Sequence, residues 1–330
     1  MKKLLQKLLC ALLTLALTVA PAMMLSATAA TANPESDFEY FINGDIAYLT
    51  NYVGTAERVV VPATLGGKPV ERIHSFGANK NVVSVTLPDT VRVIGQYAFV
   101  NCSSLSEVHL PEGLLTIEVS AFGGQTLRSI HIPSTTSYID NGVFALCGLE
   151  EITVADGNPY YYVKGNCLIE RKSEAVVQGC KTSVIPDGVK TIRYGAFCGT
   201  DVTEIVIPDS VRTIEDYAFY SNRTLTSVTL GSGVQTIGND AFCATGLTEI
   251  HIPANVVTMG EDVFFACTEL TDITCDLPFR TGSWNENWLR YCSATVHWNV
   301  DAAIMGDLNA NGAIDSFDYL LLKRHCLNTF

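Results

Sequence analysis

EVHLPEGLLTIEVSAF (residues 107–122) and EIVIPDSVRTIEDYAF (residues 204–219) are two copies of a pattern that recurs through the chain. Most neighbouring copies lie 22 or 23 residues apart, with one interval of 26 and one of 31. The residues that close the first apolar pair of each copy are Val61, Leu87, Leu110, Ile132, Val154, Ile185, Ile207, Leu230, Ile252 and Cys275. A period in the low twenties is too short for tetratricopeptide or ankyrin units and lies within the leucine-rich repeat range.

Each copy predicts one coil of a solenoid. In residues 107–110 polar and apolar side chains alternate, which indicates a short strand with Val108 and Leu110 on one face. The following proline ends the strand because it has no N–H to donate. A second apolar pair and an Ala-Phe pair then fill the interior. One coil cannot cover its own apolar face, so we expect an α/β-type repeat solenoid: a mainly β leucine-rich repeat rod with short irregular or helical turns.

The third position after the recurring phenylalanine is a polar residue or a cysteine. It holds Cys102, Gln125, Cys147, Thr200, Asn222, Thr245 and Cys267. These residues suit a buried ladder that bonds to the backbone of the next coil, so we interpret the thiols as packing groups. The cysteines lack the paired close spacings of a disulfide scaffold, and we expect few or no bridges. Cys167 and Cys180 are the first pair to check.

The repeat resembles the BspA-type leucine-rich repeats of bacterial surface proteins, whose units run Leu-Pro-x-x-Val-x-x-Ile-Gly-x-x-Ala-Phe. The likeness covers about residues 38 to 298, including an opening hairpin over 38–50 and a longer unit over 156–169. It implies the family's solenoid fold and a place at the cell surface. Some copies keep the glycine of the pattern, whereas others replace it with Glu118, Asp140, Arg193 or Glu215. We expect the replaced turns to avoid positive φ or to carry mild strain.

The N-terminus is typical of a secretory signal peptide. Lys2, Lys3 and Lys7 precede an apolar run over residues 8–25, and small residues follow over 26–32. Cleavage after Ala29 or Ala32 fits, and a retained membrane anchor is the alternative. Removal of residues 1–32 takes the formal charge from −13 to −16, since it deletes three lysines. Nucleic acid is therefore not an expected partner, and we predict a secreted or cell-surface protein.

Residues 307–318 have the spacing of a calcium loop. Oxygen side chains stand at loop positions 1, 3, 5, 9 and 12, and Gly312 stands at position 6. The predicted ligands are Asp307, Asn309, Asn311, the carbonyl of Ala313, Asp315 and Asp318. The alternative is a polar turn before a helix.

This tail resembles a dockerin repeat, because position 12 is aspartate, Gly306 precedes the loop, and a Leu-rich helix follows it. The resemblance implies an EF-hand-like loop and helix over 299–330, with a cohesin scaffold module as partner. It also implies that Ser316, Phe317, Lys323 and Arg324 contact the cohesin. A full dockerin has two such units and this sequence shows one, so residues 33–298 would be the solenoid and 299–330 a half module.

No motif of a catalytic site occurs, so we expect no enzyme, and the outward strand positions give the better functional clue. The first outward column alternates Ser or Thr with Glu107, Glu151, Glu204, Glu249 and Asp272, and includes Ser84. The second column makes His109 and His131 neighbours, which could share a metal or proton or be plain surface histidines. Tyr160, Tyr161 and Tyr162 form either a packed loop or a stacking surface. Three tryptophans over 284–298 form either an end cap or an exposed sugar platform.

Two functions fit these features. The first is a secreted binding or adhesion protein whose repeat surface binds a protein or glycan and whose calcium-dependent tail tethers it to a cohesin scaffold. The second is an accessory component or hydrolase of extracellular polysaccharide breakdown, because dockerins usually accompany such enzymes.

Overall fold

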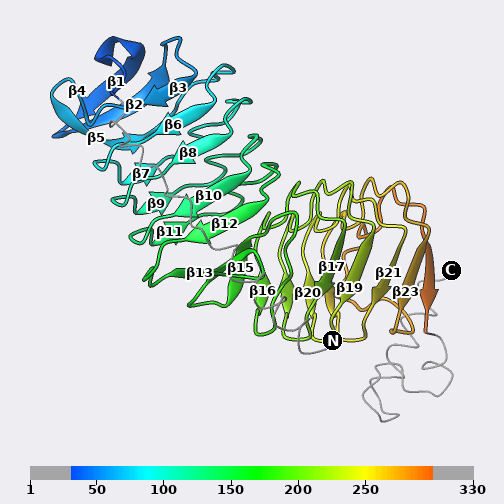
Figure 1. The fold of residues 1–330 in the computed structure, drawn as a ribbon. Coiled ribbons are helices and arrows are strands. Elements are labelled where there is room, and N and C mark those ends of the chain that lie inside the picture. The colour runs from blue at the N-terminus through cyan, green and yellow to red at the C-terminus, as the bar shows by residue number, and fades with distance from the viewer. Residues whose placement is uncertain (1–30, 300–330) are drawn as a thin grey trace, which may run out of the picture. The chain divides into compact units, whose positions relative to one another are not determined.

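The computed structural model describes residues 31–299, which form a stack of short β coils (Figure 1). The first strand of each coil, here called a main strand, pairs in parallel with main strands of neighbouring coils. The main strands are β3 (Arg58–Val60), β6 (Ser84–Thr86), β8 (Glu107–His109), β10 (Ser129–Ile132), β12 (Glu151–Val154), β17 (Glu204–Ile207), β19 (Ser227–Leu230), β21 (Glu249–Ile252), β23 (Asp272–Cys275) and β24 (Thr295–Trp298). β24 adds a coil beyond the ten strand ends counted in the sequence.

A second set of strands forms another side of each coil. Most contain two residues, and they pair in parallel and in register within two separate sheets, one ending at β11 and one containing β15 to β22. They are β5 (Lys68–Ile73), β7 (Val93–Ile94), β9 (Thr116–Ile117), β11 (Tyr138–Ile139), β15 (Ala175–Gln178), β16 (Thr191–Ile192), β18 (Thr213–Ile214), β20 (Thr236–Ile237) and β22 (Thr258–Met259). The short β4 (Thr64–Leu65) pairs antiparallel with β5.

The helical part of the sequence expectation is wrong for the described residues. Within 31–299 the one helix is the three-residue 3-10 helix η1 (Glu35–Asp37), and the connections between strands are turns. After the main strands the proline carbonyl accepts the turn hydrogen bond, as from Val91 N to Pro88 O at 3.0 Å. The predicted loop and helix of the tail lie outside the described residues.

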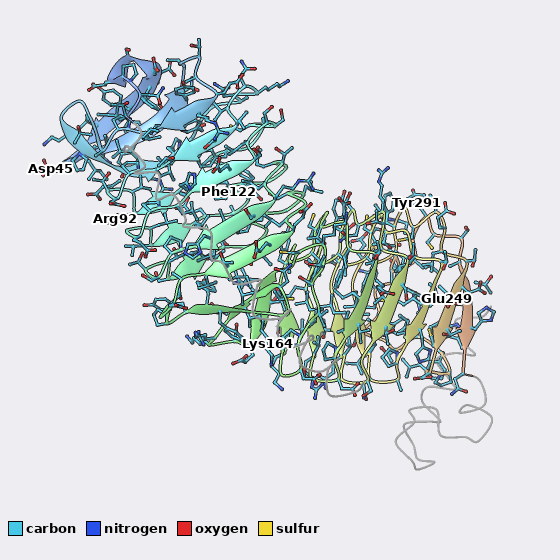
Figure 2. All side chains as sticks on the ribbon, viewed as in Figure 1. Asp45, Arg92, Phe122, Lys164, Glu249 and Tyr291 are labelled. Carbon is cyan, nitrogen blue, oxygen red and sulfur yellow. The ribbon has the colours of Figure 1, made fainter. Side chains whose placement is uncertain are left out.

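The phenylalanines align as predicted in an interior spine. Phe76, Phe99, Phe122 and Phe144 stack in sequence, and Phe197, Phe219, Phe242 and Phe264 repeat the arrangement. Ring centroids of successive members are 5.0 to 5.8 Å apart, and each ring is at most 1% exposed. Phe122 is labelled among the coils in Figure 2. Offset stacks at this spacing add to the energy of burying the rings, so the spine is the main cohesive element of the coils.

The predicted polar ladder beside the spine is present, but its bonds run to the preceding coil. Gln125 donates from Nε2 to Phe99 O at 2.7 Å, and Cys147 donates from Sγ to Phe122 O at 2.7 Å. Asn222 donates from Nδ2 to Phe197 O, and Cys267 from Sγ to Phe242 O at 3.0 Å. Burial raises the pKa of Cys147 to about 12, so this thiol stays protonated at neutral pH. The ladder gives these phenylalanine carbonyls a donor from the following coil, and Phe99 O and Phe197 O also accept a turn bond from Cys102 N and Thr200 N.

As expected, the positions that replace the glycine, Glu118, Asp140, Arg193 and Glu215, do not have positive φ, but the glycines that are kept do not have it either. Gly260 does not have positive φ, whereas Asp262, two positions later, has φ of 55°. A Cβ at Gly260 would collide with the backbone nitrogen of Asn239 in the preceding coil. Close approach of neighbouring coils, not turn conformation, therefore favours glycine there. Where Glu118 replaces it, the carboxylate accepts from Gln96 N at 2.9 Å and from Arg72 at 2.7 Å.

One hairpin precedes the regular coils and a second interrupts them, as the sequence predicted. The first joins β1 (Phe38–Asn43) and β2 (Ile46–Tyr52), with Gly44 at φ 63° in the turn. The second joins β13 (Tyr161–Lys164) and β14 (Cys167–Glu170), and β14 continues into β15 as an antiparallel pair. Two-residue hairpin turns require residues with positive φ, and in the second hairpin Gly165 and Asn166 have this conformation.

The β14–β15 pair separates two hydrophobic clusters. Leu168 and Val177 belong to the cluster of the N-terminal coils, whereas Ile169 and Val176 belong to that of the C-terminal coils. All four side chains are buried because each strand packs on both faces. Cys167 and Cys180, the pair singled out in the sequence, are both buried free thiols.

The tryptophans close the C-terminal cluster rather than forming an exposed platform. Trp284 and Trp288 are buried, with ring centroids 5.2 Å apart. Trp284 also donates from Nε1 to Val256 O at 3.0 Å, and Trp298 lies 5.7 Å from its ring. The boundaries predicted at residues 32 and 299 stay predictions, because both flanking segments lie largely outside the described residues.

Candidate interaction surface

The main-strand face consists of the outward side chains of the main strands and of residues 182–187, which occupy the equivalent place in the longer coil. The register aligns its first column in four runs: Arg58, Ser84 and Glu107; Ser129 and Glu151; Glu204 and Ser227; Glu249, Asp272 and Thr295. Ser84 is a correction to the predicted exposed stripe, since it is only 5% exposed. Arg58 reaches over it to contact Glu107 at 3.0 Å, which covers the small side chain.

The four predicted glutamates lie on this face but differ in their surroundings. Glu107 contacts Arg58 at 3.0 Å and His109 Nε2 at 3.0 Å, and the Arg58 hydrogen bond lowers the pKa of Glu107. Glu151, Glu204 and Glu249 make no ion pair or side-chain hydrogen bond within residues 31–299. Figure 2 labels Glu249, the first residue of β21. Three exposed carboxylates are therefore available to a partner.

The histidines of the face bond to their own neighbours. His131 Nδ1 lies 2.8 Å from Thr153 Oγ1, and His109 Nε2 lies 3.0 Å from Glu107. The strands that carry these two histidines, β10 and β8, belong to different sheets. Each histidine therefore bonds to a partner other than the second histidine. His297 Nε2 lies 2.9 Å from Asp272. A hydrogen bond from Thr271 and one from His297 lower the pKa of Asp272. Across residues 31–299 no three His, Cys, Asp or Glu side chains are grouped to hold a metal ion.

A groove that the sequence analysis did not single out crosses the middle of the face. Val184 and Val206 are 70% and 64% exposed, in a column that otherwise holds mostly Thr and His. The groove has a volume of about 680 Å³ and includes Lys164, Asp187 and Glu204 in its walls. The sequence signal that could have indicated this groove is the pair of valines at positions that are mostly polar in the other coils. That signal is weak, because valine is common in strands.

The tip of the second hairpin forms one wall of this groove and is held by several hydrogen bonds. Asn166 donates from Nδ2 to Glu150 O at 2.7 Å and to Thr182 Oγ1 at 2.9 Å. Gly165 O accepts from Val184 N at 2.8 Å, and Asn166 O accepts from Ser183 Oγ at 2.6 Å. The hairpin tip therefore joins the coils on either side of it, where direct main-strand pairing is absent.

The predicted tyrosine cluster divides between the two interpretations. Tyr161 is buried, and its hydroxyl oxygen accepts from Ile139 N at 2.9 Å. Tyr162 donates to Glu174 at 2.9 Å, and the Arg171 guanidinium lies 4.9 Å from its ring centre. Tyr160 is 46% exposed. The packed-loop interpretation holds for Tyr161, while Tyr160 is open to solvent.

The tail residues predicted to bind calcium and a cohesin lie outside the described residues, so they stay predictions. They are Asp307, Asn309, Asn311, Ala313, Asp315, Asp318, Ser316, Phe317, Lys323 and Arg324. In the part of the chain that the structure describes, no helix has the length and apolar character to cross a membrane.

Comparison with known proteins agrees with this architecture. Residues 72–186 and 190–295 match the BspA type leucine-rich repeat region, in six copies. A leucine-rich cell surface protein from Faecalibacterium prausnitzii has a similar structure, with a TM-score of 0.53 and 21% identity over 87% of this chain and 99% of that one. A leucine-rich repeat protein from Bacteroides ovatus gives a TM-score of 0.52 and 22% identity over 82% and 71%. No curated protein matches.

The parallel ladders, the coil length and the interior spine define a leucine-rich repeat solenoid. The matched residues cover more than half of the chain, and this protein belongs to the BspA-type leucine-rich repeat family. The two similar structures agree with it in fold.

Proposed function

We propose that this protein is an exported, non-catalytic adhesion or binding protein whose main-strand face binds a protein or glycan outside the cell. The observation that carries the proposal is the set of exposed carboxylates, Glu151, Glu204 and Glu249, which have no partner within residues 31–299. Charged groups left free on a rigid surface steer and orient a complementary partner. The surface location is supported by the N-terminal leader pattern and by the name of the similar cell surface protein.

The binding half is tested with the purified chain on arrays of extracellular proteins and of glycans. The variant is Glu151→Gln combined with Glu204→Gln and Glu249→Gln, and the control is Glu57→Gln, which changes an exposed acid beside β3. We expect one or more ligands whose binding falls in the triple variant and weakens with added salt. Ligands that the triple variant binds as well as the native chain would contradict this use of the face.

The tethering half rests on the tail. We propose that Asp307, Asn309, Asn311, Ala313, Asp315 and Asp318 hold one calcium ion, and that Ser316, Phe317, Lys323 and Arg324 contact a cohesin-type scaffold module. Calorimetry should show calcium binding that Asp307→Ala abolishes, and cohesin capture that requires calcium. Capture that is absent in calcium, or that is unchanged by Asp307→Ala, would remove this half.

The competing function is a direct part in polysaccharide breakdown. Glycoside hydrolysis requires two carboxyl groups at a defined separation across the scissile bond. Release of sugars by the purified chain, abolished by a single carboxylate substitution, would overturn the non-catalytic proposal.

A further inference from the structure

We propose that the groove between the hairpin tip and β17 binds an extended protein segment that places an aliphatic side chain beside a lysine or arginine. The inference rests on the proposed binding function and names the site and the partner chemistry. Its first support is the apolar floor. Val184 and Val206 are the two most exposed aliphatic residues of the main-strand face, at 70% and 64%. An exposed apolar pair framed by polar side chains is typical of a recognition site.

The second support is an open place in the main-strand ladder. Most neighbouring coils are joined at the strand start by a backbone bond, such as Thr226 N to Thr203 O at 2.9 Å or Thr271 N to Thr248 O at 3.0 Å, although the steps from β8 to β10 and from β19 to β21 also lack one. No backbone hydrogen bond joins residues 181–187 to residues 202–208. The edge of β17 that faces the groove therefore makes no such bond to residues 181–187. An extended segment can use that edge, since main-chain bonding to a free strand edge is a general mode of peptide recognition.

The third support is charge. Glu204 and Asp187 line the groove, and neither makes an ion pair or side-chain hydrogen bond within residues 31–299. Lys164 stands on the hairpin wall, labelled in Figure 2. A partner cation between the two carboxylates gains from both, and the formal net charge of −13 of the chain favours basic partners over acidic ones.

The groove is also held in shape before binding. The hairpin tip is fixed by the bonds from Asn166 to Glu150 O and Thr182, and by that from Val184 N to Gly165 O. Binding therefore does not include the free-energy cost of ordering the hairpin tip, so a small contact surface can give a higher affinity.

The test is selection of a random dodecapeptide library, displayed on phage, against the full chain in calcium. The best peptide is then synthesised, and its dissociation constant is measured by fluorescence anisotropy. We expect selected peptides to carry Val, Ile or Leu next to Lys or Arg. We expect Val206→Lys to weaken binding by about tenfold or more, because it removes apolar contact and adds a repulsive charge. Glu204→Gln should weaken binding less and reduce its dependence on salt.

Matched controls separate the groove from other surfaces. Val257→Lys changes a valine that is 49% exposed and lies beside β22, and it should leave the dissociation constant within about twofold. Melting temperatures of both valine variants should match the native chain, since both side chains are exposed. No enriched peptide, or a peptide that Val206→Lys does not affect, would overturn the groove proposal.

The same variant distinguishes this failure from failure of the proposed function. Array ligands that still bind the Val206→Lys chain but are lost in the triple glutamine variant would leave the main-strand face as the binding surface and refute the groove. If the groove bound glycans selectively and no peptide were enriched, the proposal of a protein partner would be wrong.

Discussion

The interior of the coils and the main-strand face obey different rules, although the same short strands build both. Inside, the coils other than the longer one repeat the same phenylalanine, and Phe99, Phe122, Phe219 and Phe242 are all fully buried. Outside, equivalent positions differ from coil to coil, as with Val206 beside Thr229 in the second column. Packing imposes the same requirement on each coil because each is covered by its neighbours. The outer face has no such requirement, so its departures from the pattern are the better guide to function.

The comparison predicts its largest effect at the spine. Phe219→Ala should lower the free energy of unfolding by about 3–5 kcal/mol, because it leaves a cavity between two stacked rings. Those rings lie 5.0 and 5.1 Å away, centroid to centroid. Urea unfolding followed by circular dichroism measures the loss, and Phe219→Leu provides a milder control. A cost below about 1 kcal/mol would mean that the stack is not the cohesive element.

The polar ladder should have the next largest effect. Asn222 is fully buried and donates to the carbonyls of Phe197 and Phe219. Asn222→Ala leaves both acceptors without this donor, which should cost about 1–3 kcal/mol in the same urea experiment. A matched change on the solvent side, Ser227→Ala, removes an exposed hydroxyl and should cost little. Equal costs for the two variants would contradict the distinction between interior and face.

A pH-dependent effect is expected on the turn side of the coils. Burial, followed by the charges of Asp262 and Asp216, raises the pKa of Asp240. A raised folded-state pKa means that this group supports the fold below its ordinary pKa, and that the support is lost as pH rises through the folded value. Asp240→Asn should therefore gain melting temperature relative to the native chain between pH 3.5 and pH 7. Asparagine also tolerates the φ of 52° at this position.

Melting scans in buffers of matched ionic strength measure the difference. If the variant were less stable at pH 7 than at pH 3.5, each relative to the native chain, the assigned direction of the shift would be wrong.

The smallest stability effect is expected on the main-strand face itself. Glu249→Gln removes a charge that has no partner within residues 31–299, so the free energy of unfolding should change by no more than about 0.5 kcal/mol. Urea unfolding beside Phe219→Ala gives the direct contrast. A large loss would show that this carboxylate supports the fold and is not free for a partner.

Periodicity predicted the interior well, because each buried position recurs and its requirements are local. The positions of most main strands, both hairpins, the phenylalanine spine and the polar ladder follow from the spacing of Val, Leu, Pro and Ala-Phe, whereas β24 was not predicted and the predicted strand ending at Ile185 is not a strand. The role of glycine was not predictable, because close approach at Gly260 depends on the neighbouring coil and not on the local sequence.

The surface was predicted only in part for the same physical reason. The alternation of polar and apolar residues placed Glu107 and Glu204 on one face. It could not show that Glu107 forms an ion pair with Arg58, whereas Glu204 has no such partner within residues 31–299. The groove depends on the hairpin tip at Gly165 and Asn166 lying beside residues 182–187, a contact that no repeat position encodes. The calcium loop over 307–318 stays a prediction from spacing alone.

Amide hydrogen exchange of the full chain, with and without the best selected peptide, tests most directly whether binding uses the main-strand face. The account predicts added protection in residues 182–187 and 204–208, the segments that contain Val184 and Val206. Protection confined to the opposite turns, in residues 97–103 and 120–124, would contradict it, because those segments line a separate groove on the side of the Ala-Phe pairs.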